Sequence, residues 1–425
     1  MAEPRLPGRI ASASADTSPS SDLPVAAALR AIIDAVSPVG ETETLALRAA
    51  PGRILAADLS SPIDVPPCDN SAMDGYAMRS TDLDATRATE LAVVGMALAG
   101  RPYDGACPGG SAVRIMTGAA MPAGLDTVVP QESVEADDSR VLVPPGQRPG
   151  QHRRLAGEDL ATGSLALPAG RRLTAADIGL AASLGIGELE LRRRVRVAFF
   201  STGDELQSIG SPLGIGRIYD SNRYVLGAML DRLGVEAIDL GVVPDRPEAL
   251  EATMREAAGR ADAIISTGGV SVGEADYTRA VMARLGRVEF WSIAMRPGRP
   301  MAFGRIGKTW YFGLPGNPVA VMVSFHFLAR PALLALGGAL PTAPVYARAR
   351  ALGAIRKRAG RTEYQRGFIA ADADGVMQVE LTGSQGSGRL SSMSQANCMV
   401  VLHHEQGPVA AGEWVDCLPF EGLMG

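Results

Sequence analysis

Two predicted strands end in the same Ser-Thr-Gly tripeptide, and acidic residues follow each of them. The segment VRVAFFSTGDEL covers residues 195–206, and its strand end contains Ser201, Thr202, Gly203, Asp204 and Glu205. The segment ADAIISTGGVSVGEADYT covers residues 261–278, and its strand end contains Gly268, Gly269, Ser271, Gly273, Glu274 and Asp276. A third strand ends in GLPGNPV, residues 313–319. Because open α/β folds bind ligands at the carboxyl ends of their parallel strands, we expect the chemistry at this edge of the sheet, called the lip below.

The third strand end has the composition of an anion site. Asn317 is placed to cap the following helix and Pro318 to occupy its first turn, after Pro315 and Gly316. The helix is apolar nearly all round, so we expect it to be buried with its free N–H groups directed at the lip. Arg296 and Arg299 could add guanidinium groups that bind an oxyanion. The alternative for each glycine-rich loop is an ordinary turn.

Acidic residues gather just past the predicted strand ends: Asp204, Glu205, Asp220, Asp245, Glu274 and Asp276. Carboxylates beside an anion site commonly hold Mg²⁺, because hard cations prefer oxygen ligands. A single aspartate after a strand is more often a helix cap. Asp245 fits that alternative less well, because Pro247 at the first helical position makes Arg246 the cap.

A further polar cluster lies in loops of a β-rich region. The segments are residues 69–77, 114–122 and 153–160, and they contain Asp74, Thr117 and Asp159. These residues could serve a reaction, and ordinary turn chemistry explains them equally well.

The bulk composition excludes several classes of function. The 425 residues carry a formal net charge of −5, with 46% hydrophobic and 20% charged residues. This is typical of a soluble globular protein without the basic field that recruits nucleic acid. The four cysteines are scattered, with neither the spacing of a zinc site nor that of a disulfide framework. A protein without such a framework fits a reducing cytoplasm. We find no run of about 18 apolar residues, so we expect no membrane span.

The pattern of elements indicates several domains. A helix with an apolar stripe begins near residue 23, and short β segments with turns fill residues 62–158. Strands alternate with helices from residue 195 to about 338, which implies a largely parallel sheet covered by helices. In the helix over residues 221–234 we expect Val225, Ala228, Met229 and Leu233 to share one face, with Gly234 ending the helix. After residue 344 the pattern returns to β.

Together these segments resemble the MoeA family of molybdenum insertases, which is equivalent to the C-terminal domain of gephyrin. The matching segments are DVPPCDNSAMDGYA, RIMTGAAMP, GEDL, FSTGDEL, IYDSN, STGGVSVGEADYT, MRPGRP and GLPGNP. The resemblance implies a multidomain α/β plus β protein that forms a homodimer. Its implied parts are a disordered tail (1–22), an elongated helical linker and dimerisation domain (23–61 and 159–194), an inserted β-rich domain (62–158), a MogA-like α/β parallel-sheet module (195–343) and a C-terminal β-barrel (344–425).

The implied reaction is the attack of molybdate on adenylyl-molybdopterin, with divalent-metal-dependent hydrolysis that releases AMP. By motif, the catalytic residues would be Asp74, Thr117, Asp159, Glu205, Asp245 and Asp276, and the last three would bind Mg²⁺. The implied substrate-binding residues are Ser201, Thr202, Gly203, Asp204, Asp220, Asn222, Gly268, Gly269, Ser271, Gly273, Arg296, Arg299, Pro315, Gly316, Asn317 and Pro318. A molybdopterin adenylyltransferase would be the donor partner, and molybdoenzymes or their chaperones the acceptors. The resemblance also implies a cytoplasmic protein without nucleic-acid or membrane partners.

The sequence departs from the family pattern near Arg296. Arg296 and Arg299 stand where relatives often carry lysine, and this exchange keeps the positive charge. Ser292 replaces another common lysine, so we assign no role to Ser292. Two alternative functions remain open. One is a nucleotide pyrophosphatase of the competence-damage type, which uses a similar α/β module. The other is a non-enzymatic scaffold, as in gephyrin.

Overall fold

The computed structural model describes residues 22–269 and 277–420. Ser271, Gly273 and Asp276, which we predicted as site residues, therefore lie outside the described residues, as does nearly all of the predicted tail. The chain divides into two compact units. The first contains residues 1–43, 52–56 and 190–425, and the second contains residues 44–51 and 57–189. The finer domain ranges given above remain predictions.

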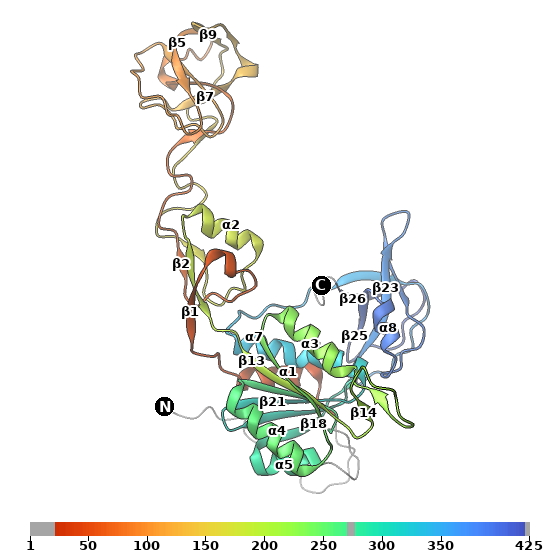
Figure 1. The fold of residues 1–425 in the computed structure, drawn as a ribbon. Coiled ribbons are helices and arrows are strands. Elements are labelled where there is room, and N and C mark those ends of the chain that lie inside the picture. Colours follow the sequence, from red (N-terminus) through yellow and green to blue (C-terminus); the bar gives the residue numbers. More distant parts are fainter. Residues whose placement is uncertain (1–21, 270–276, 421–425) are drawn as a thin grey trace. The chain divides into compact units, whose positions relative to one another are not determined.

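The centre of the first unit is a six-stranded mixed sheet (Figure 1). In spatial order its strands are β16 (Glu236–Val243), β13 (Arg196–Thr202), β17 (Ala263–Thr267), β21 (Thr309–Leu314), β20 (Pro300–Ile306) and β18 (Gly286–Ser292). The first four strands are parallel to one another, and β20 pairs antiparallel with both β21 and β18. The three strand ends singled out in the sequence, β13, β17 and β21, are therefore direct neighbours at one edge.

Helices cover both faces of this sheet. One face packs against α1 (Val25–Ala35), α3 (Asn222–Leu233) and the continuous helix formed by α6 (Pro318–Ser324), the π-helical η4 (Phe325–Ala329) and α7 (Arg330–Leu336). The other face packs against α4 (Pro247–Arg260) and α5 (Tyr277–Leu285). A short parallel pair, β14 (Leu206–Gln207) and β15 (Ile218–Tyr219), follows β13.

Local sequence signals explain where several helices begin and end. Pro247 occupies the first turn of α4 with Arg246 at the cap, as predicted. Gly234 ends α3 with a φ of 81°, a conformation that glycine adopts without strain. Of the residues expected to share one face of α3, Leu233 is buried and Ala228 is exposed, and the buried leucines are Leu226, Leu230 and Leu233. The larger leucines at i, i+4 and i+7 define the buried stripe.

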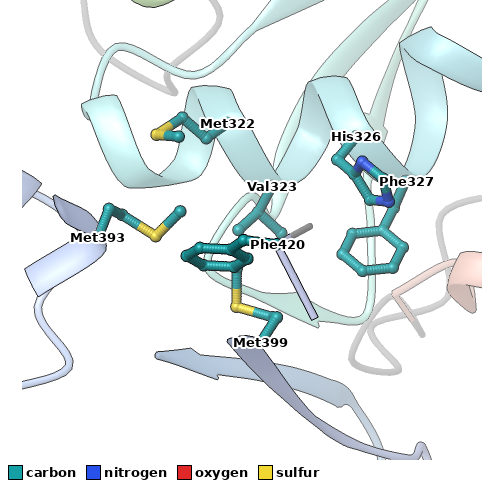
Figure 2. A pocket seen from close by; sticks show the side chains of 7 residues that line it. All are labelled: Met322, Val323, His326, Phe327, Met393, Met399 and Phe420. Carbon is teal, nitrogen blue, oxygen red and sulfur yellow. The ribbon is translucent and has the colours of Figure 1, made fainter. Parts of the chain in front are cut away.

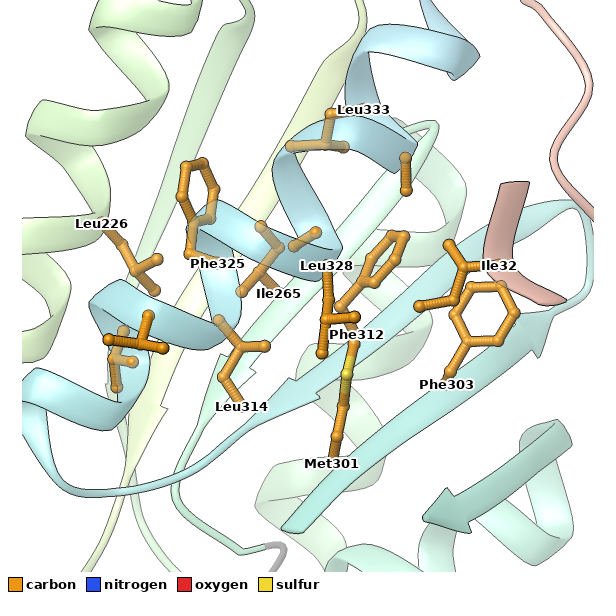
Figure 3. Close-up of a cluster of buried hydrophobic side chains, with 14 of the residues drawn as sticks. Ile32, Leu226, Ile265, Met301, Phe303, Phe312, Leu314, Phe325, Leu328 and Leu333 are labelled. Atoms are coloured by element: carbon orange, nitrogen blue, oxygen red, sulfur yellow. The ribbon is translucent and has the colours of Figure 1, made fainter. Parts of the chain in front are cut away.

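The main core lies between the sheet and the α6–α7 helix. Figure 3 shows Phe325, Leu328 and Leu333 of that helix in one cluster with Ile265 and Phe312 of the strands. Residues 318–336 are long and apolar enough to cross a membrane by length and composition, which corrects our expectation that no such stretch exists. Their burial in this core accounts for the composition. Ala28 and Ile32 of α1 also belong to this core, so α1 packs on the α/β module.

The C-terminal region forms a closed five-stranded barrel. Its strands are β22 (Ala347–Ala351), β23 (Thr362–Ala371), β24 (Met377–Leu381), β25 (Cys398–Leu402) and β26 (Trp414–Pro419). They follow the order β23-β24-β22-β26-β25, and a β23–β25 pairing closes the ring. The remaining elements here are α8 (Leu390–Gln395) and β19 (Met295–Arg296), which pairs with β23. The predicted barrel is confirmed.

The second unit contains a six-stranded β sheet in the region predicted to be β-rich. Its strands are β7 (Thr127–Pro130), β4 (Gly75–Met78), β6 (Ser111–Ile115), β5 (Thr89–Ala97), β9 (Arg140–Val143) and β8 (Glu135–Ala136). Two-stranded pairs join β3 (Asn70–Ser71) to β10 (Arg153–Arg154) and β2 (Leu59–Ser60) to β11 (Leu165–Leu167). The other elements are η1 (Leu47–Ala49), η2 (Ser80–Asp82), η3 (Gln131–Ser133) and α2 (Ala175–Ser183). The pair β1 (Thr42–Ala46) and β12 (Glu188–Arg192) spans the division between the units.

Candidate active site

The three strand ends of the lip meet at a pair of glycines. Gly268 donates its N–H to the carbonyl oxygen of Leu314 at 3.2 Å. A Cβ on Gly268 would lie 2.3 Å from the carbonyl oxygen of Thr202, and Gly268 and Gly269 have φ values of +88° and +64°. A Cβ on Gly316 would lie 3.7 Å from the Cα of Gly268. Glycine is thus required by both space and backbone conformation at Gly268.

Buried polar atoms without a partner surround these glycines. Thr202 Oγ1, Asn222 Oδ1 and Thr278 Oγ1 are buried and have no hydrogen-bond partner among the described residues. A buried polar group without a partner costs about 1–3 kcal/mol, so such groups need an explanation. Three of them at one edge of the sheet make this edge a candidate ligand site. Thr278 lies outside our predicted set of site residues, although it is the last residue of the STGGVSVGEADYT segment.

A second set of polar residues at the lip is fully engaged within the protein. Ser201 donates to Asp220 Oδ1 at 3.0 Å and accepts a hydrogen bond from Thr267 at 3.0 Å. Arg223 donates to Asp220 Oδ2 at 3.3 Å and to Asp239 at 2.7 Å. Ser201 and Asp220 are almost completely buried. The structure therefore gives these two predicted substrate-binding residues a supporting role behind the lip.

Two of the three predicted metal ligands lie on adjacent strand ends. Thr202 pairs with Val243, so Glu205 and Asp245 follow neighbouring strands by three and two residues. Glu205 and Asp204 are exposed and Asp245 is half-buried. Among the described residues no three acidic, histidine or cysteine side chains form a cluster that could hold a metal ion. Two carboxylates here fit the oxygen preference of Mg²⁺, and the third predicted ligand, Asp276, is outside the described residues.

The start of α6 differs from the predicted anion site. Asn317 occupies the cap position and Pro318 the first helical position, but the Asn317 side chain makes no capping hydrogen bond. The N–H of Val319 donates to the carbonyl oxygen of Ser387 at 3.1 Å. A loop of the barrel thus takes one of the amides that we expected an anion to bind. Asn222 Nδ2 donates to the carbonyl oxygen of Gly316 at 2.7 Å, which joins α3 to the same turn.

Arg296 lines a polar cavity of about 440 Å³ with residues of the barrel. Arg356, Glu363, Gln365, Arg366 and Gln385 also line it. Arg366 is fully buried, and both burial and the nearby charge of Arg296 lower its pKa to about 10. Three arginines, Arg296, Arg356 and Arg366, outnumber the single carboxylate of Glu363 in the lining, and this excess of positive charge favours a bound anion. We call this cavity the arginine pocket.

Arg366 was missed in the sequence, and its hydrogen bonds explain why. Its guanidinium donates to the carbonyl oxygens of Ser384, Gln385 and Gly386 at 3.0–3.3 Å, and to Ser392 Oγ at 3.0 Å. These bonds use four of its five N–H groups. The pairing depends on a loop that only the folded barrel brings to β23.

The structure places Arg299 away from the arginine pocket. Its guanidinium donates to Asp22 Oδ1 and to Ser292 Oγ, each at 2.9 Å. Ser292 also donates to Asp22 at 2.7 Å. Burial raises the pKa of Asp22, but these hydrogen bonds and the charge of Arg299 outweigh burial and hold the pKa below its ordinary value. Arg299 therefore holds the segment that precedes α1.

In the second unit the structure joins two of the three predicted residues. Asp74 Oδ1 accepts hydrogen bonds from the N–H and the hydroxyl of Thr117, both at 2.7 Å. The bond from the N–H, followed by the bond from the hydroxyl, holds the pKa of Asp74 below its ordinary value. The positive charge of Arg114 lowers this pKa further. Asp74 itself is exposed at the surface. Asp159 is exposed too, and its N–H donates to the carbonyl oxygen of Val65 at 3.0 Å.

A small cavity between the α6–η4 helix and the barrel is apolar. Its volume is about 20 Å³, and it is lined by Met322, Val323, His326, Phe327, Met393, Met399 and Phe420. Figure 2 shows Phe420 beside Val323, with Met393 and Met399 approaching from the barrel. Burial, followed by the charge of Arg330, lowers the pKa of His326 to about 3. This cavity is a small gap in the packing of the core. The neutral imidazole of His326 is the only polar side chain among its lining residues, so the cavity is a poor candidate for a substrate site.

The chain matches known proteins along nearly its whole length. Residues 23–185 match the MoeA N-terminal region (domain I and II), residues 198–335 a probable molybdopterin binding domain, and residues 348–420 the MoeA C-terminal region (domain IV). A molybdopterin molybdenumtransferase of Haemophilus influenzae is 44% identical over 387 residues, which cover 91% of this chain and 95% of that protein. The chain belongs to the MoeA family.

Other MoeA proteins agree with this assignment. A molybdopterin molybdenumtransferase of Nostoc is 39% identical over 88% of this chain and 87% of its own length. The crystal structure of the molybdopterin biosynthesis moeA protein from Pyrococcus horikoshii has a TM-score of 0.80 and 28% identity, and covers 93% of this chain and 99% of its own. The predicted family and fold class are confirmed, and the family is one of transferase enzymes.

Proposed function

We propose that this MoeA protein inserts molybdenum into molybdopterin in molybdenum cofactor biosynthesis. The names of its relatives and the match to a molybdopterin binding domain support this activity. In the detailed form of the proposal, adenylyl-molybdopterin and molybdate are the substrates and AMP is released. A molybdopterin adenylyltransferase supplies the substrate in the cytoplasm, and molybdoenzymes or their chaperones receive the product.

One observation carries the assignment of the substrate to the lip. Thr202 and Asn222 each have a buried polar atom without a partner among the described residues, and both flank a turn built from glycines. Glycine N–H groups and a threonine hydroxyl are donors that suit phosphate oxygens. Asn222 Oδ1 is an acceptor and suits an N–H or O–H of the substrate. The nucleotide-linked pterin offers both kinds of group.

The chemistry of the lip also suits a divalent cation. We assign its binding to Glu205, Asp245 and Asp276, because carboxylate oxygens are the ligands that Mg²⁺ prefers. When bound, Mg²⁺ would neutralise the phosphate charge that develops as the phosphoanhydride is hydrolysed. In this proposal the residues of the lip orient the phosphates, and water forms a new P–O bond as the bridging P–O bond breaks, while the proton of the water passes to solvent.

We assign molybdate to the arginine pocket. Arg296 is exposed at its edge, with NH1 4.0 Å from Glu363 Oε2, whereas Arg366 forms its buried wall. The cavity of about 440 Å³ has ample room for a tetrahedral oxyanion. Charge-assisted hydrogen bonds from guanidinium groups are the strong contacts that such an anion makes. The cavity lies in the same unit as the lip.

The proposal includes a homodimer. Asp74, Thr117 and Asp159 would act on the lip of the partner subunit, since motif similarity links them to the reaction. Analytical ultracentrifugation combined with activity assays tests this part. A fully active monomer would refute it.

The direct test of the function is a reconstituted assay. Purified protein is incubated with adenylyl-molybdopterin, molybdate and Mg²⁺, and AMP and cofactor are measured over time. We expect AMP release that needs molybdate and the metal, and its loss in Asp276→Ala with the fold intact by circular dichroism. A normal rate of AMP release by Asp276→Ala would remove that residue from the mechanism. Turnover of ADP-ribose would instead favour the pyrophosphatase alternative.

A further inference from the structure

Thr278 is a buried residue at the lip that the sequence motifs did not assign. It is the second residue of α5 and only 1% exposed. Its Oγ1 has no hydrogen-bond partner among the described residues. A Cβ placed on Gly269 would lie 2.2 Å from this oxygen. The hydroxyl is therefore directly beside the glycine turn that ends β17.

The surroundings of the hydroxyl favour an anionic oxygen. Thr278 lies in the first turn of α5, where backbone N–H groups and the helix dipole give a partial positive charge. Thr202, whose Oγ1 also lacks a partner among the described residues, has its Cγ2 3.4 Å from the point that a Cβ on Gly269 would occupy. Two threonine side chains thus flank one glycine, and neither hydroxyl donates to a described residue.

The neighbouring unpartnered atom has the opposite character. The hydrogen bond from Asn222 Nδ2 to the Gly316 carbonyl requires an N–H donor, which fixes the orientation of the amide. Asn222 Oδ1 is consequently an acceptor. Its residue is 6% exposed, so water does not readily satisfy it. The three atoms form a pattern of two donors and one acceptor.

We propose that Thr278 binds a phosphate oxygen of the substrate and contributes to substrate selectivity at the lip. This inference rests on the proposed function, because it takes the nucleotide-linked substrate as the ligand. Since no described residue satisfies the hydroxyl in the free protein, in this proposal its hydrogen bond forms when the substrate arrives. Stability and binding should therefore respond to Thr278 in opposite directions.

The substitution Thr278→Val separates these two effects. Valine has the shape of threonine but no hydroxyl, so it removes the buried unsatisfied group. We expect the urea midpoint of the free protein to rise, and the KM for adenylyl-molybdopterin to increase roughly tenfold or more, as for loss of a hydrogen bond to a charged group. Thr278→Ser restores the hydroxyl and should return KM close to that of the wild type.

Thr309→Val is the matched control. Thr309 is 3% exposed, but its Oγ1 donates to the carbonyl oxygens of Ala258 and Ala261 at 3.0 and 2.8 Å. The same change there should lower the urea midpoint and leave KM unchanged. Calorimetric titration with AMP, which carries a phosphate of the substrate, gives a second measure of binding.

The outcomes distinguish this inference from the proposed function. Higher stability with weaker substrate and AMP binding in Thr278→Val supports the inference. Unchanged KM and AMP affinity in that variant, or a fall in its stability like that of Thr309→Val, would overturn it. Absence of molybdenum insertion by the wild type would count against the proposed function, and the AMP titration would still decide the role of Thr278.

Discussion

At the scale of single residues, the candidate site contains polar groups that bond to each other within the fold and polar groups that we propose bind a ligand. Asp220 and Ser201 satisfy each other, whereas Thr202 and Asn222 each retain an atom without a partner among the described residues. Burial alone does not distinguish these two classes, because all four residues are at most 6% exposed. The two classes differ in whether each polar atom of the side chain finds a hydrogen-bond partner among the described residues.

Arg296 provides a test of the arginine pocket. Arg296→Gln removes a charge beside Arg366 without disturbing the buried guanidinium, so we expect normal folding and a KM for molybdate that rises roughly tenfold. Arg358→Gln is the control, because Arg358 is an exposed arginine of the same barrel and does not line the pocket. Equal KM values for molybdate in the two variants would contradict this assignment.

Asp74 and Thr117 offer a second test. Thr117→Val removes one of the two hydrogen bonds to Asp74, so its pKa should rise toward the ordinary value and molybdenum insertion should fall. Thr86→Val is a close match, because Asp84 accepts the same two hydrogen bonds from Thr86. NMR titration of both aspartates should show similar pKa changes, with activity lost only in Thr117→Val. Equal activity in both variants would indicate that the Asp74 turn is only structural.

At the scale of secondary-structure elements, the lip depends on close contact between strand ends. Gly268→Ala would place a Cβ 2.3 Å from the Thr202 carbonyl oxygen and impose a positive φ, so the strand ends must separate. We expect a loss of several kcal/mol of unfolding free energy, beyond the roughly 1–3 kcal/mol of the backbone conformation. Gly216 also has a positive φ, but a Cβ there would meet open space, so Gly216→Ala should lose only the free energy of the unfavourable backbone conformation. Equal losses in urea titrations would contradict the close approach.

His326 in η4 should make the free energy of unfolding depend on pH. The pKa of His326 is about 3 in the folded protein, against 6.5 ordinarily, so between these values the unfolded chain binds a proton that the folded chain does not. Stability should therefore fall as pH falls through this range, by on the order of 2 kcal/mol between pH 7 and pH 5. His326→Gln should lose this part of the dependence in urea titrations at both pH values. An unchanged slope in the variant would refute it.

These elements also show how far the sequence could predict the structure. Strand ends, the proline at the start of α4 and the glycine at the end of α3 are local signals, and the predictions based on them are confirmed. The Ser387 carbonyl that bonds to Val319, the loop around Arg366 and the pair Asp22–Arg299 join segments distant in the chain. Such contacts exist only after folding, so composition and spacing do not reveal them. The residues of the lip were predicted by motif, whereas their division into supporting and ligand-facing groups depends on hydrogen bonds that only the folded chain forms.

At the scale of the whole molecule, the first unit gathers two adjacent functions. Its α/β module provides the lip, and its barrel completes the arginine pocket and donates the Ser387 carbonyl to the start of α6. Deleting the barrel should therefore impair both molybdate binding and the start of α6. The second unit holds the Asp74–Thr117 pair, which we propose acts on a partner subunit.

The most direct test of the central claim is a crystal structure with bound adenylyl-molybdopterin. We predict that phosphate oxygens lie within hydrogen-bond distance of the N–H group of Gly269 and of the Thr202 hydroxyl, and that a donor group of the substrate faces Asn222 Oδ1. Substrate bound at another surface, with these three positions unchanged and in contact only with solvent or protein, would contradict the account.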